Sequence, residues 1–511
     1  MVSMPLRLVE ENPDAVLAEF DSLRDWVRQE ARNGKDVDFA ENGIESRGRE
    51  LCRLLLAEFV ALSGVGDVGR ALEATRVRPV VVTDSEGRSQ PAGQLVGPTV
   101  ILSHRRMHEV HPTSVFGEIP VDRLGYGQRG EESIFPLDEQ LALPARSYSY
   151  LLQKKLVVAV ARGPFLEATR SVHEATGQQV ATANADDVVI DAVLDFDDFH
   201  RSHPVKPPEE RAPLQIAVVD GKGIHMRELV EESASVEHPD GDHRLGTKQM
   251  ATVAAVYNIE PHVRSVDDIV QECHPKPLAS VPVRPRPEDK RVWASLIKSK
   301  DDIFAEVAEE MLRRDPEHTK LWACITDGER ALRRRAKELL GAYGCFILIL
   351  DLWHALEYLW EAANALCGKG TPEARIWCTK QLRRLLEGKV SGVARGMKQA
   401  ATKRGIRGAR KEVIHKTAAY FLANKDAMKY DEYIAAGLPI GSGVGEGAVK
   451  NLIKDRLEGT GMHWGELSAE AVLKARALEI CGDMDEYWDF HIAQEQRRLH
   501  GTRIWRPVSN S

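Results

Sequence analysis

Three acidic residues stand where their side chains can act together on one substrate. Asp220 and Asp327 each follow a short apolar run and are each followed by glycine, while Glu446 stands in a glycine-rich segment that leads into a helical pattern. In open α/β sheets, ligands bind at the carboxyl ends of the strands, so two strands that end in aspartate deliver both carboxylates to one edge. Taken alone, each Asp-Gly pair is also typical of an ordinary turn.

Three converging carboxylates suit the chemistry of phosphodiesters. Cleavage by water and joining by a 3′-hydroxyl both need an activated oxygen nucleophile and a stabilised leaving oxygen. Two Mg²⁺ ions about 3.5–4 Å apart supply both, and they prefer hard oxygen ligands. We therefore expect Asp220, Asp327 and Glu446 to be catalytic and to bind two ions of Mg²⁺ (or Mn²⁺).

The segment around Glu446 carries cations as well. At helical spacing Glu446, Lys450 and Lys454 lie on one face, where the two lysines can hold phosphates. The alternative is ordinary pairing on a solvated helix, with a carboxylate that favours the helix N-terminus. The loop GSGVGEG fits neither the dinucleotide-binding pattern nor the phosphate-binding loop, which excludes both. The positions that should face the core are apolar: Val449, Leu452, Ile453 and Leu457.

The elements that must position these residues form an α/β pattern. Apolar and β-branched runs predict strands at residues 214–219, 224–229, 251–259, 321–325 and 345–351. Helical patterns cover residues 288–314 and follow Glu329 and Asp351. The order β-β-β-α-β-α-β-α is that of an RNase H-like mixed sheet with helices on both faces.

The rest of the chain divides by texture. A polar, helical N-terminal region covers residues 1–95, and a β-hairpin-containing region covers 96–149. Residues 150–200 hold three helical segments with the outline of a helix-turn-helix. Because the last segment is acidic, a packing or dimerisation bundle is an equal alternative. The proline-rich linker 201–213 then precedes a catalytic domain at 214–480 and a C-terminal tail at 481–511.

Composition limits the function classes. The 511 residues carry a net charge of −8, yet residues 366–425 hold fifteen Lys and Arg against three Asp and Glu. Seven scattered cysteines, never spaced Cys-x-x-Cys, argue against a zinc ribbon and a disulfide framework. Since no apolar run is long enough to cross a bilayer and the N-terminus lacks the pattern of a secretory signal, we expect a cytoplasmic protein without a membrane partner.

Several motifs make the chain similar to a known family. They are VVDGKGIHM, ITDGERAL, ILDLWHALEYLWEAA and PIGSGVGEGAVKNLIKDRLEGTGMHW, followed by AEAVLKARAL and DEYWDFH, and upstream SVFGEIPVDRLGYGQRG, FPLDEQLALP and YSYLLQKK. They span roughly residues 95 to 500 and resemble the bacterial insertion-sequence transposases of the ISKra group, DDE enzymes with an RNase H-like catalytic core. The resemblance carries the family's catalytic triad onto Asp220, Asp327 and Glu446. One departure is Gly445, where we expect a bulky residue in the relatives.

The resemblance also implies roles near these carboxylates. Asp351-Leu-Trp-His354 looks like the Asp/Cys-x-x-His motif of related transposases, in which His354 would contact the scissile phosphate or support the metal ligands. A core or capping histidine is the alternative. Trp464 is a candidate for stacking on a base, with packing beside a glycine-rich turn as the alternative.

Many DDE enzymes carry an insertion before the glutamate, and a basic helical insertion at residues 366–432 fits this pattern. With so few acidic partners nearby, its cations are candidates for phosphate contacts rather than a solvated face. The candidates are Arg383, Arg384, Lys403, Arg404, Arg407, Arg410 and Lys411.

The resemblance implies a DNA transposase that binds the terminal inverted repeats of its element, cleaves them and joins them to target DNA. It also implies a homo-oligomer, and a bacterial protein associated with the nucleoid. Two alternatives stay open: an RNase H-like nuclease without strand transfer, and a domesticated DNA-binding protein without catalysis. All three carboxylates are present, which disfavours the last.

Overall fold

The computed structural model describes residues 15–83, 89–227, 248–273, 284–459 and 461–508, without the side chains of residues 78–94. The chain is a mixed α/β protein that divides into two units. Unit 1 is Met1–His200 with Met484–Ser511, and unit 2 is Arg201–Asp483. In the part of the chain described, no helix combines the length and the apolar character needed to span a bilayer.

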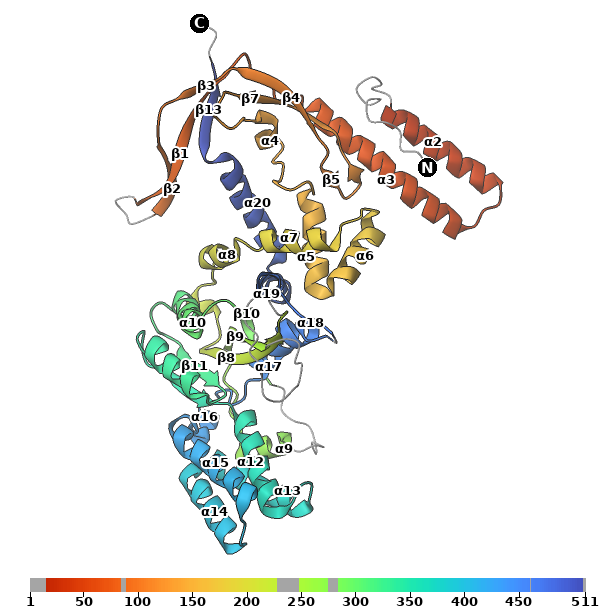
Figure 1. The fold of residues 1–511 in the computed structure, drawn as a ribbon. Coiled ribbons are helices and arrows are strands. Elements are labelled where there is room, and N and C mark those ends of the chain that lie inside the picture. Colours follow the sequence, from red (N-terminus) through yellow and green to blue (C-terminus); the bar gives the residue numbers. More distant parts are fainter. Residues whose placement is uncertain (1–14, 84–88, 228–247, 274–283, 460, 509–511) are drawn as a thin grey trace, which may run out of the picture. The chain divides into compact units, whose positions relative to one another are not determined.

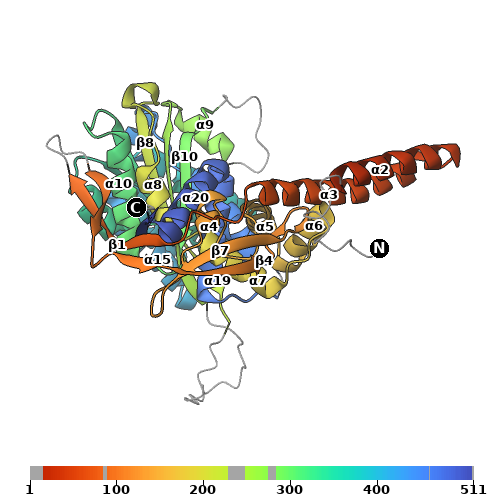
Figure 2. The same cartoon turned by 90° about the horizontal axis from the view of Figure 1, so that it is seen from above.

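Unit 1 begins with two long helices, α2 (Ala15–Arg32) and α3 (Val37–Leu62), which pack side by side (Figures 1 and 2). Asp36 caps α3 by accepting a hydrogen bond from the Phe39 N–H at 2.8 Å. The strands that follow are β1 (Leu72–Thr83), β2 (Ser89–Leu95), β3 (Val100–Leu102), β4 (His104–Val110), β5 (Thr113–Ser114), β6 (Gly117–Glu118) and β7 (Val121–Gly127). The antiparallel pair β4 and β7 is the hairpin expected in this region.

The helical region expected up to residue 95 ends earlier, at Leu62. Strand β1 pairs with β2, with β3 and with β13 (Arg503–Pro507), which lies more than 400 residues further along the chain. The last residues are therefore part of unit 1 rather than a tail. Local periodicity could not predict the pairing of β1 with β13, because these two strands are distant in sequence.

Unit 1 contains further helices. They are α4 (Pro136–Gln140), α5 (Tyr150–Arg162), α6 (Phe165–Thr176), α7 (Thr182–Ala192), α8 (Phe196–Ser202) and α20 (Met484–His500). The buried carboxylate of Asp195 is 2.8 Å from Nδ1 of His491 and 2.5 Å from a guanidinium nitrogen of Arg498, both on α20. At least this acidic residue of the helix-turn-helix-like region therefore serves packing.

Unit 2 is built on a five-stranded sheet with the order β10-β9-β8-β11-β12. Strand β11 pairs in parallel with β8 and β12, whereas β9 is antiparallel to both β8 and β10. The strands are β8 (Leu214–His225), β9 (Lys248–Ile259), β10 (Glu288–Ser295), β11 (Leu321–Thr326) and β12 (Ile347–Leu350).

Helices cover both faces of this sheet. The Gln215 side chain donates to the carbonyl of Met311 on α10 (Lys300–Arg314) at 2.8 Å, so α10 lies on the face of Gln215. On the opposite face, α17 (Gly443–Val449) approaches Val218, since side chains of a strand alternate between faces. Every residue from Leu214 to Val219 is accordingly buried.

Two elements differ from the sequence-based expectation. The apolar pattern predicts separate strands at residues 214–219 and 224–229, but β8 runs on through Gly221 and Gly223 and pairs with β9 as far as His225↔Lys248; residues 228 and 229 lie outside the described part. Residues 288–295 form the edge strand β10 instead of a helix, and the helix begins only at Lys300, after the capping box of Ser299 and Asp302. Edge pairing with β9 is a tertiary effect that local periodicity does not reveal.

The interval between β12 and Glu446 is helical, as the sequence predicts. It comprises α12 (Leu352–Cys367), α13 (Pro372–Leu386), α14 (Val390–Lys403), α15 (Gly408–Asn424) and α16 (Tyr430–Ala435). The remaining helices of unit 2 are α9 (Val266–Glu272), α11 (Arg330–Arg335) with a π-helical turn at Ala336–Leu340, α17 with a π-helical turn at Lys450–Lys454 and α18 (Asp455–Leu457), and α19 (Glu466–Cys481). Val449, Leu452, Ile453 and Leu457 are all buried, which confirms the predicted core face.

Candidate active site

Three neighbouring strands carry an aspartate in the same row. Val219 of β8 pairs with Thr326 of β11, which pairs with Leu350 of β12. The next residue in each case is acidic: Asp220, Asp327 and Asp351. Neighbouring strands lie about 4.8 Å apart, so the three carboxylates start from one edge of the parallel part of the sheet. Contrary to expectation, Asp220 does not end β8, which continues to His225. Asp220 nevertheless lies one position beyond the end of the neighbouring strand, because Val219 pairs with Thr326, the last residue of β11.

The Asp220 carboxyl group is partly buried and lies among other acids. Its Oδ1 accepts a hydrogen bond from the Gly221 N–H at 2.7 Å. Burial raises the pKa of Asp220, and the charges of Asp327 and Asp351 raise this pKa further, against the lowering effects of Gly221 and His354. The ionised form of this carboxylate is therefore destabilised where it stands.

Asp327 is held by a turn that only glycine permits. Gly328 has φ +82°, and a Cβ there would lie 2.4 Å from Cδ1 of Leu350 and 2.6 Å from the hydroxyl oxygen of Tyr420. The Tyr420 hydroxyl donates to the Asp327 carbonyl at 2.6 Å, and its ring stacks on Tyr358 with centroids 4.0 Å apart. Helix α15 of the insertion thus supports the Asp327 turn. The sequence did not reveal this role of Tyr420, because no local pattern distinguishes it from a core tyrosine.

Asp351 joins three parts of the site. It is 1% exposed, caps α12 by accepting from the Trp353 N–H at 3.0 Å, and lies 3.2 Å from Nδ1 of His354. Its carboxylate also accepts from the Ser442 hydroxyl at 2.5 Å and from the Ser442 N–H at 3.2 Å. Asp351 therefore connects the β12–α12 junction to the segment that precedes Glu446.

His354 is partly exposed, with a pKa raised to about 9. The hydrogen bond to Asp351 is the largest cause; the charges of Asp351, Asp220 and Asp327 add to it, while burial lowers the pKa. His354 is therefore an imidazolium at neutral pH, beside the carboxylates. His354 contacts Asp351, which caps α12, and it also interacts with the charges of Asp220 and Asp327. The role of a capping histidine and a role beside the scissile phosphate are therefore compatible.

Glu446 reaches the site because a glycine precedes it. A Cβ at Gly445 would lie 2.4 Å from Cγ1 of Val218, two residues before Asp220, so a bulky residue would push α17 off the sheet. The exposed Glu446 carboxyl group has its pKa raised by burial of part of the group, by Asp351 and by Asp220, and lowered by His354. Glu357, one turn beyond His354 on α12, also raises this pKa and is an acid of the site that the sequence motifs do not indicate.

The residues fit a divalent cation in chemistry. The acids are oxygen donors, and burial together with the charges of neighbouring acids raises the pKa values of Asp220 and Glu446, so a positive charge bound beside them would stabilise their ionised forms. In the side-chain positions of the described residues, no group of three or more His, Cys, Asp or Glu already converges closely enough to hold one ion. Since like charges repel, a bound cation would have to draw the carboxylates of Asp220, Asp327 and Glu446 together.

Lys450 and Lys454 are both exposed on the helix that carries Glu446. The helix widens to a π-helical turn over Lys450–Lys454, so residues five apart, rather than four, lie above one another there. Such turns occur frequently at functional sites.

Four of the candidate cations of the insertion bind neighbouring groups of the protein. Arg404 donates to the Leu366 carbonyl at 3.0 Å and Arg410 to the Ala365 carbonyl at 2.7 Å, so both cap the C-terminus of α12. Arg383 is paired with Asp267 at 2.5 Å, and Arg384 donates to Gln381 at 3.1 Å.

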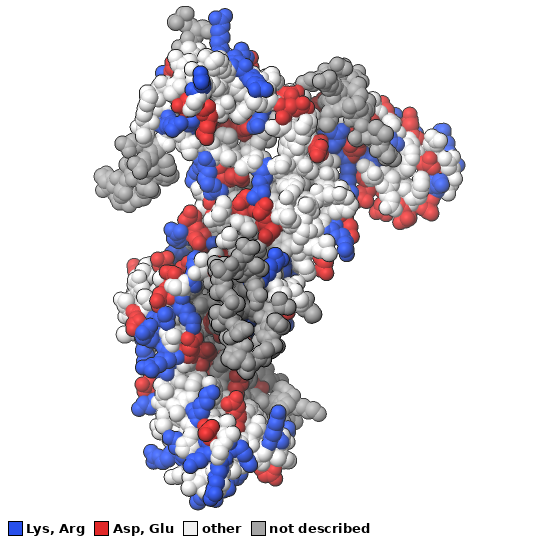
Figure 3. Space-filling model, viewed as in Figure 1, with Lys and Arg blue, Asp and Glu red and all other residues white. Residues whose placement is uncertain are grey.

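Lys403, Arg407 and Lys411 are exposed on α14, α15 and the loop between them. Figure 3 shows Lys and Arg gathered at the end of unit 2 where Figure 1 places α13 to α15. Among the described residues, these three cations do not make the carbonyl hydrogen bonds that hold Arg404 and Arg410, so they remain candidates for phosphate contact.

Trp464 does not offer a face to a base in this structure. The side chain is 6% exposed, its indole N–H donates to the Leu457 carbonyl at 3.0 Å, and the Arg456 guanidinium lies 4.9 Å from its ring centroid. Its backbone forms a parallel bridge with Met226 at the end of β8. The packing alternative is therefore correct, because Trp464 closes the core between β8 and the end of α18.

No protein-family model and no curated protein matches this chain.

Proposed function

We propose that this chain is a DNA transposase with an RNase H-like catalytic domain, which cleaves and joins DNA with Asp220, Asp327 and Glu446. The strand order of unit 2 supports the fold: a meander of β8, β9 and β10 is extended by β11 and β12, both parallel to β8. The helical insertion between β12 and α17 supports the family, because it falls where the resemblance expects it.

One observation carries the proposal. Asp220 and Asp327 start from the same row of adjacent parallel strands, and Glu446, more than 110 residues later, lies close enough to Asp220 for the charge of Asp220 to raise its pKa. Because residue 445 is a glycine, α17 can lie close to Val218 of β8. Burial and the charges of neighbouring acids raise the pKa values of Asp220 and Glu446, so these carboxylates destabilise the fold when ionised, which favours a functional role over a structural one.

The residues have distinct roles in this proposal. Asp220, Asp327 and Glu446 would hold the divalent ions, which supply an activated oxygen nucleophile and stabilise the leaving oxygen. His354 holds a proton on Nδ1 toward Asp351 and presents its charge to the scissile phosphate. Asp351 and Ser442 keep His354 and Glu446 in place. Lys403, Arg407 and Lys411 bind the DNA backbone further from the chemistry.

The test is a cleavage and joining assay with the full chain. The substrate is labelled DNA that flanks the coding sequence, since it contains the ends of the element, with Mg²⁺ or Mn²⁺. We expect Glu446→Gln to lower the cleavage rate by at least about 100-fold with DNA affinity retained. Glu361→Gln, an exposed residue further along α12, is the matched control and should remain active.

The products separate the candidate activities. Joined molecules support a transposase, whereas cleavage without joining identifies a nuclease. Equal cleavage by Glu446→Gln and the wild type would remove Glu446 from the site and reject the proposal.

A further inference from the structure

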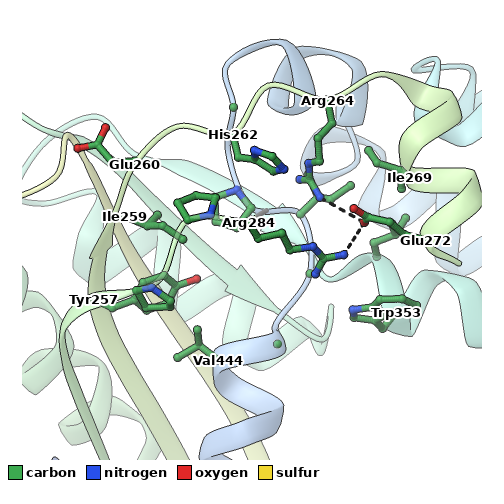
Figure 4. A pocket seen from close by; sticks show the side chains of 18 of the residues that line it. Tyr257, Ile259, Glu260, His262, Arg264, Ile269, Glu272, Arg284, Trp353 and Val444 are labelled. Atoms are coloured by element: carbon green, nitrogen blue, oxygen red, sulfur yellow. Dashed lines mark hydrogen bonds and ion pairs between the residues drawn. The ribbon is translucent and has the colours of Figure 1, made fainter. Parts of the chain in front are cut away.

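A cavity of about 230 Å³ lies in unit 2 beside the segment that carries Glu446. It is enclosed by the end of β9 and the loop to α9, by the first turn of α12, and by residues 437–444 (Figure 4). Most of its wall is apolar or aromatic: Tyr257, Ile259, Leu352, Trp353, Pro439 and Ile440. The cavity is smaller than the 300–1,000 Å³ typical of sites for drug-sized ligands, so it fits one ring system rather than a nucleotide chain.

One wall of the cavity is polar. The carboxylate of Glu272 is 2.5 Å from a guanidinium nitrogen of Arg284 and 3.7 Å from one of Arg264 (Figure 4). The side chains of Arg264 and Glu272 are 9% and 8% exposed. Such buried charges are expected to satisfy their hydrogen-bonding groups.

Three buried atoms on this wall lack hydrogen-bond partners among the described residues. They are Nε2 of His262, Nε of Arg264 and Oε1 of Glu272. Together they place two nitrogen atoms and one carboxylate oxygen, all buried, behind one edge of an otherwise apolar slot. A buried group left without a partner costs about 1–3 kcal/mol, so a ligand that satisfies these atoms is favoured.

Residues 437–444, which line one side of the cavity, continue along the chain to Glu446 of the candidate active site. Gly437 packs against the backbone of His262, whose N–H donates to the Gly437 carbonyl at 2.8 Å. The Ile440 carbonyl then accepts from the Leu352 N–H at 2.9 Å, and Ser442 binds Asp351. A ligand in the cavity would therefore press on the chain two residues before Glu446, at Val444.

We propose that this cavity takes one unpaired nucleobase of the DNA held at the catalytic carboxylates; the inference rests on the proposed function. A base is a flat ring whose faces suit the apolar walls around Ile259 and the partly exposed Trp353, and whose edge carries both donors and acceptors. A phosphate suits this cavity less well. Glu272 already pairs with both Arg264 and Arg284, and its negative charge repels anions. The base fills an apolar slot and satisfies the polar wall at the same time.

The test compares two short duplexes that differ in one unpaired position. One duplex carries an unpaired nucleotide, tested with each of the four bases, and the other carries an abasic residue at the same place. Affinities are measured for the full chain with Ca²⁺ in place of Mg²⁺. We expect at least one base to bind about tenfold more tightly than the abasic duplex, as stacking of a base on aromatic side chains would produce.

Variants that fill the cavity should abolish this preference and leave the affinity for the abasic duplex unchanged. Ile259→Trp fills it from β9, and Pro285→Trp fills it from the loop should the first variant fail to fold, which thermal unfolding reports. Val263→Trp is the matched control, since Val263 is 68% exposed and does not line the cavity. It should keep the preference.

Each outcome decides the matter. If the wild type binds neither duplex, the proposed function falls and takes this inference with it. If the wild type binds both equally, DNA binding stands and the base site is rejected. A preference that survives in both filled variants places the base elsewhere. If free deoxynucleoside monophosphates compete for the cavity while the duplexes show no preference, the cavity serves free nucleotides and the inference is wrong.

Discussion

Ser442 is joined to Asp351 by two hydrogen bonds, from its hydroxyl at 2.5 Å and from its N–H at 3.2 Å. The two residues are 91 positions apart in sequence. One precedes Glu446 and the other binds His354, so this contact sets the distance between a candidate metal ligand and a candidate phosphate contact. Both partners are buried, which gives the link its rigidity.

Removing the Ser442 hydroxyl should therefore affect the chemistry more than DNA binding. We expect Ser442→Ala to lower the cleavage rate constant by about 10- to 100-fold, since small displacements of catalytic groups have effects of this size. The KM for DNA should change little. Ser391→Ala, at an exposed position of α14, is the control. A rise in KM at an unchanged rate constant would show that Ser442 contributes to binding instead.

Gly445 should be required for its small size rather than for flexibility. Gly445→Ala places a Cβ 2.4 Å from Cγ1 of Val218, whereas a Cβ at Gly447, in the same helix, meets nothing within 4 Å. We expect Gly445→Ala to lose at least about tenfold in cleavage and Gly447→Ala to remain active. The double variant Val218→Ala with Gly445→Ala should regain activity in a double-mutant cycle. Additive losses would mean that the contact with Val218 is not the cause.

Asp220 should reduce the stability of the metal-free protein. Its pKa is raised in the folded state, so the folded protein binds this proton more tightly than the unfolded chain does, and stability is lost as pH rises from 3.8 through the raised pKa. At neutral pH in EDTA, Asp220→Asn should raise the unfolding temperature, by about 2–4 °C for each kcal/mol gained. Mg²⁺ should stabilise the wild type but not the variant. The same response to Mg²⁺ in both would exclude Asp220 as a ligand.

The pair of His354 and Asp351 should depend on pH in a different range. The pKa of His354 is raised from 6.5 to about 9, so its contribution to stability is complete below pH 6.5 and is lost as pH rises through about 9. Nuclear magnetic resonance titration, with His354→Gln to assign the signal, should give a pKa well above 6.5 in the wild type. Asp351→Asn should bring this pKa down. An unshifted pKa in the wild type would contradict the geometry of the pair.

The basic residues of the insertion should separate into binding and capping groups. The triple variant of Lys403, Arg407 and Lys411 to Ala should weaken DNA binding and reduce the slope of its salt dependence by about 0.9 for each phosphate that is no longer neutralised. Arg404→Ala and Arg410→Ala should instead lower stability by about 0.3–1 kcal/mol each, because they cap α12. Equal effects of both sets on the salt dependence would show that the capping arginines also bind DNA.

Much of the fold of unit 2 could be predicted from local patterns. The buried run before Asp220, the run before Asp327 and the helices after Glu329 and Asp351 are as expected, because apolar periodicity reports burial directly. The failures have one cause. Strand β10, the continuation of β8 through Gly221, and the pairing of β1 with β13 all depend on hydrogen bonds to another strand, which the pattern within one segment does not report.

The sequence by itself determined which side chains have the chemistry of the candidate site and which elements present Asp327 and Glu446, because residue type and periodicity are local properties. The tertiary structure alone decided that Asp351 and Ser442 meet, that Gly445 brings α17 against Val218, and that Trp464 is buried in the core. These are contacts across distant segments, and their geometry follows from how the sheet and its helices pack.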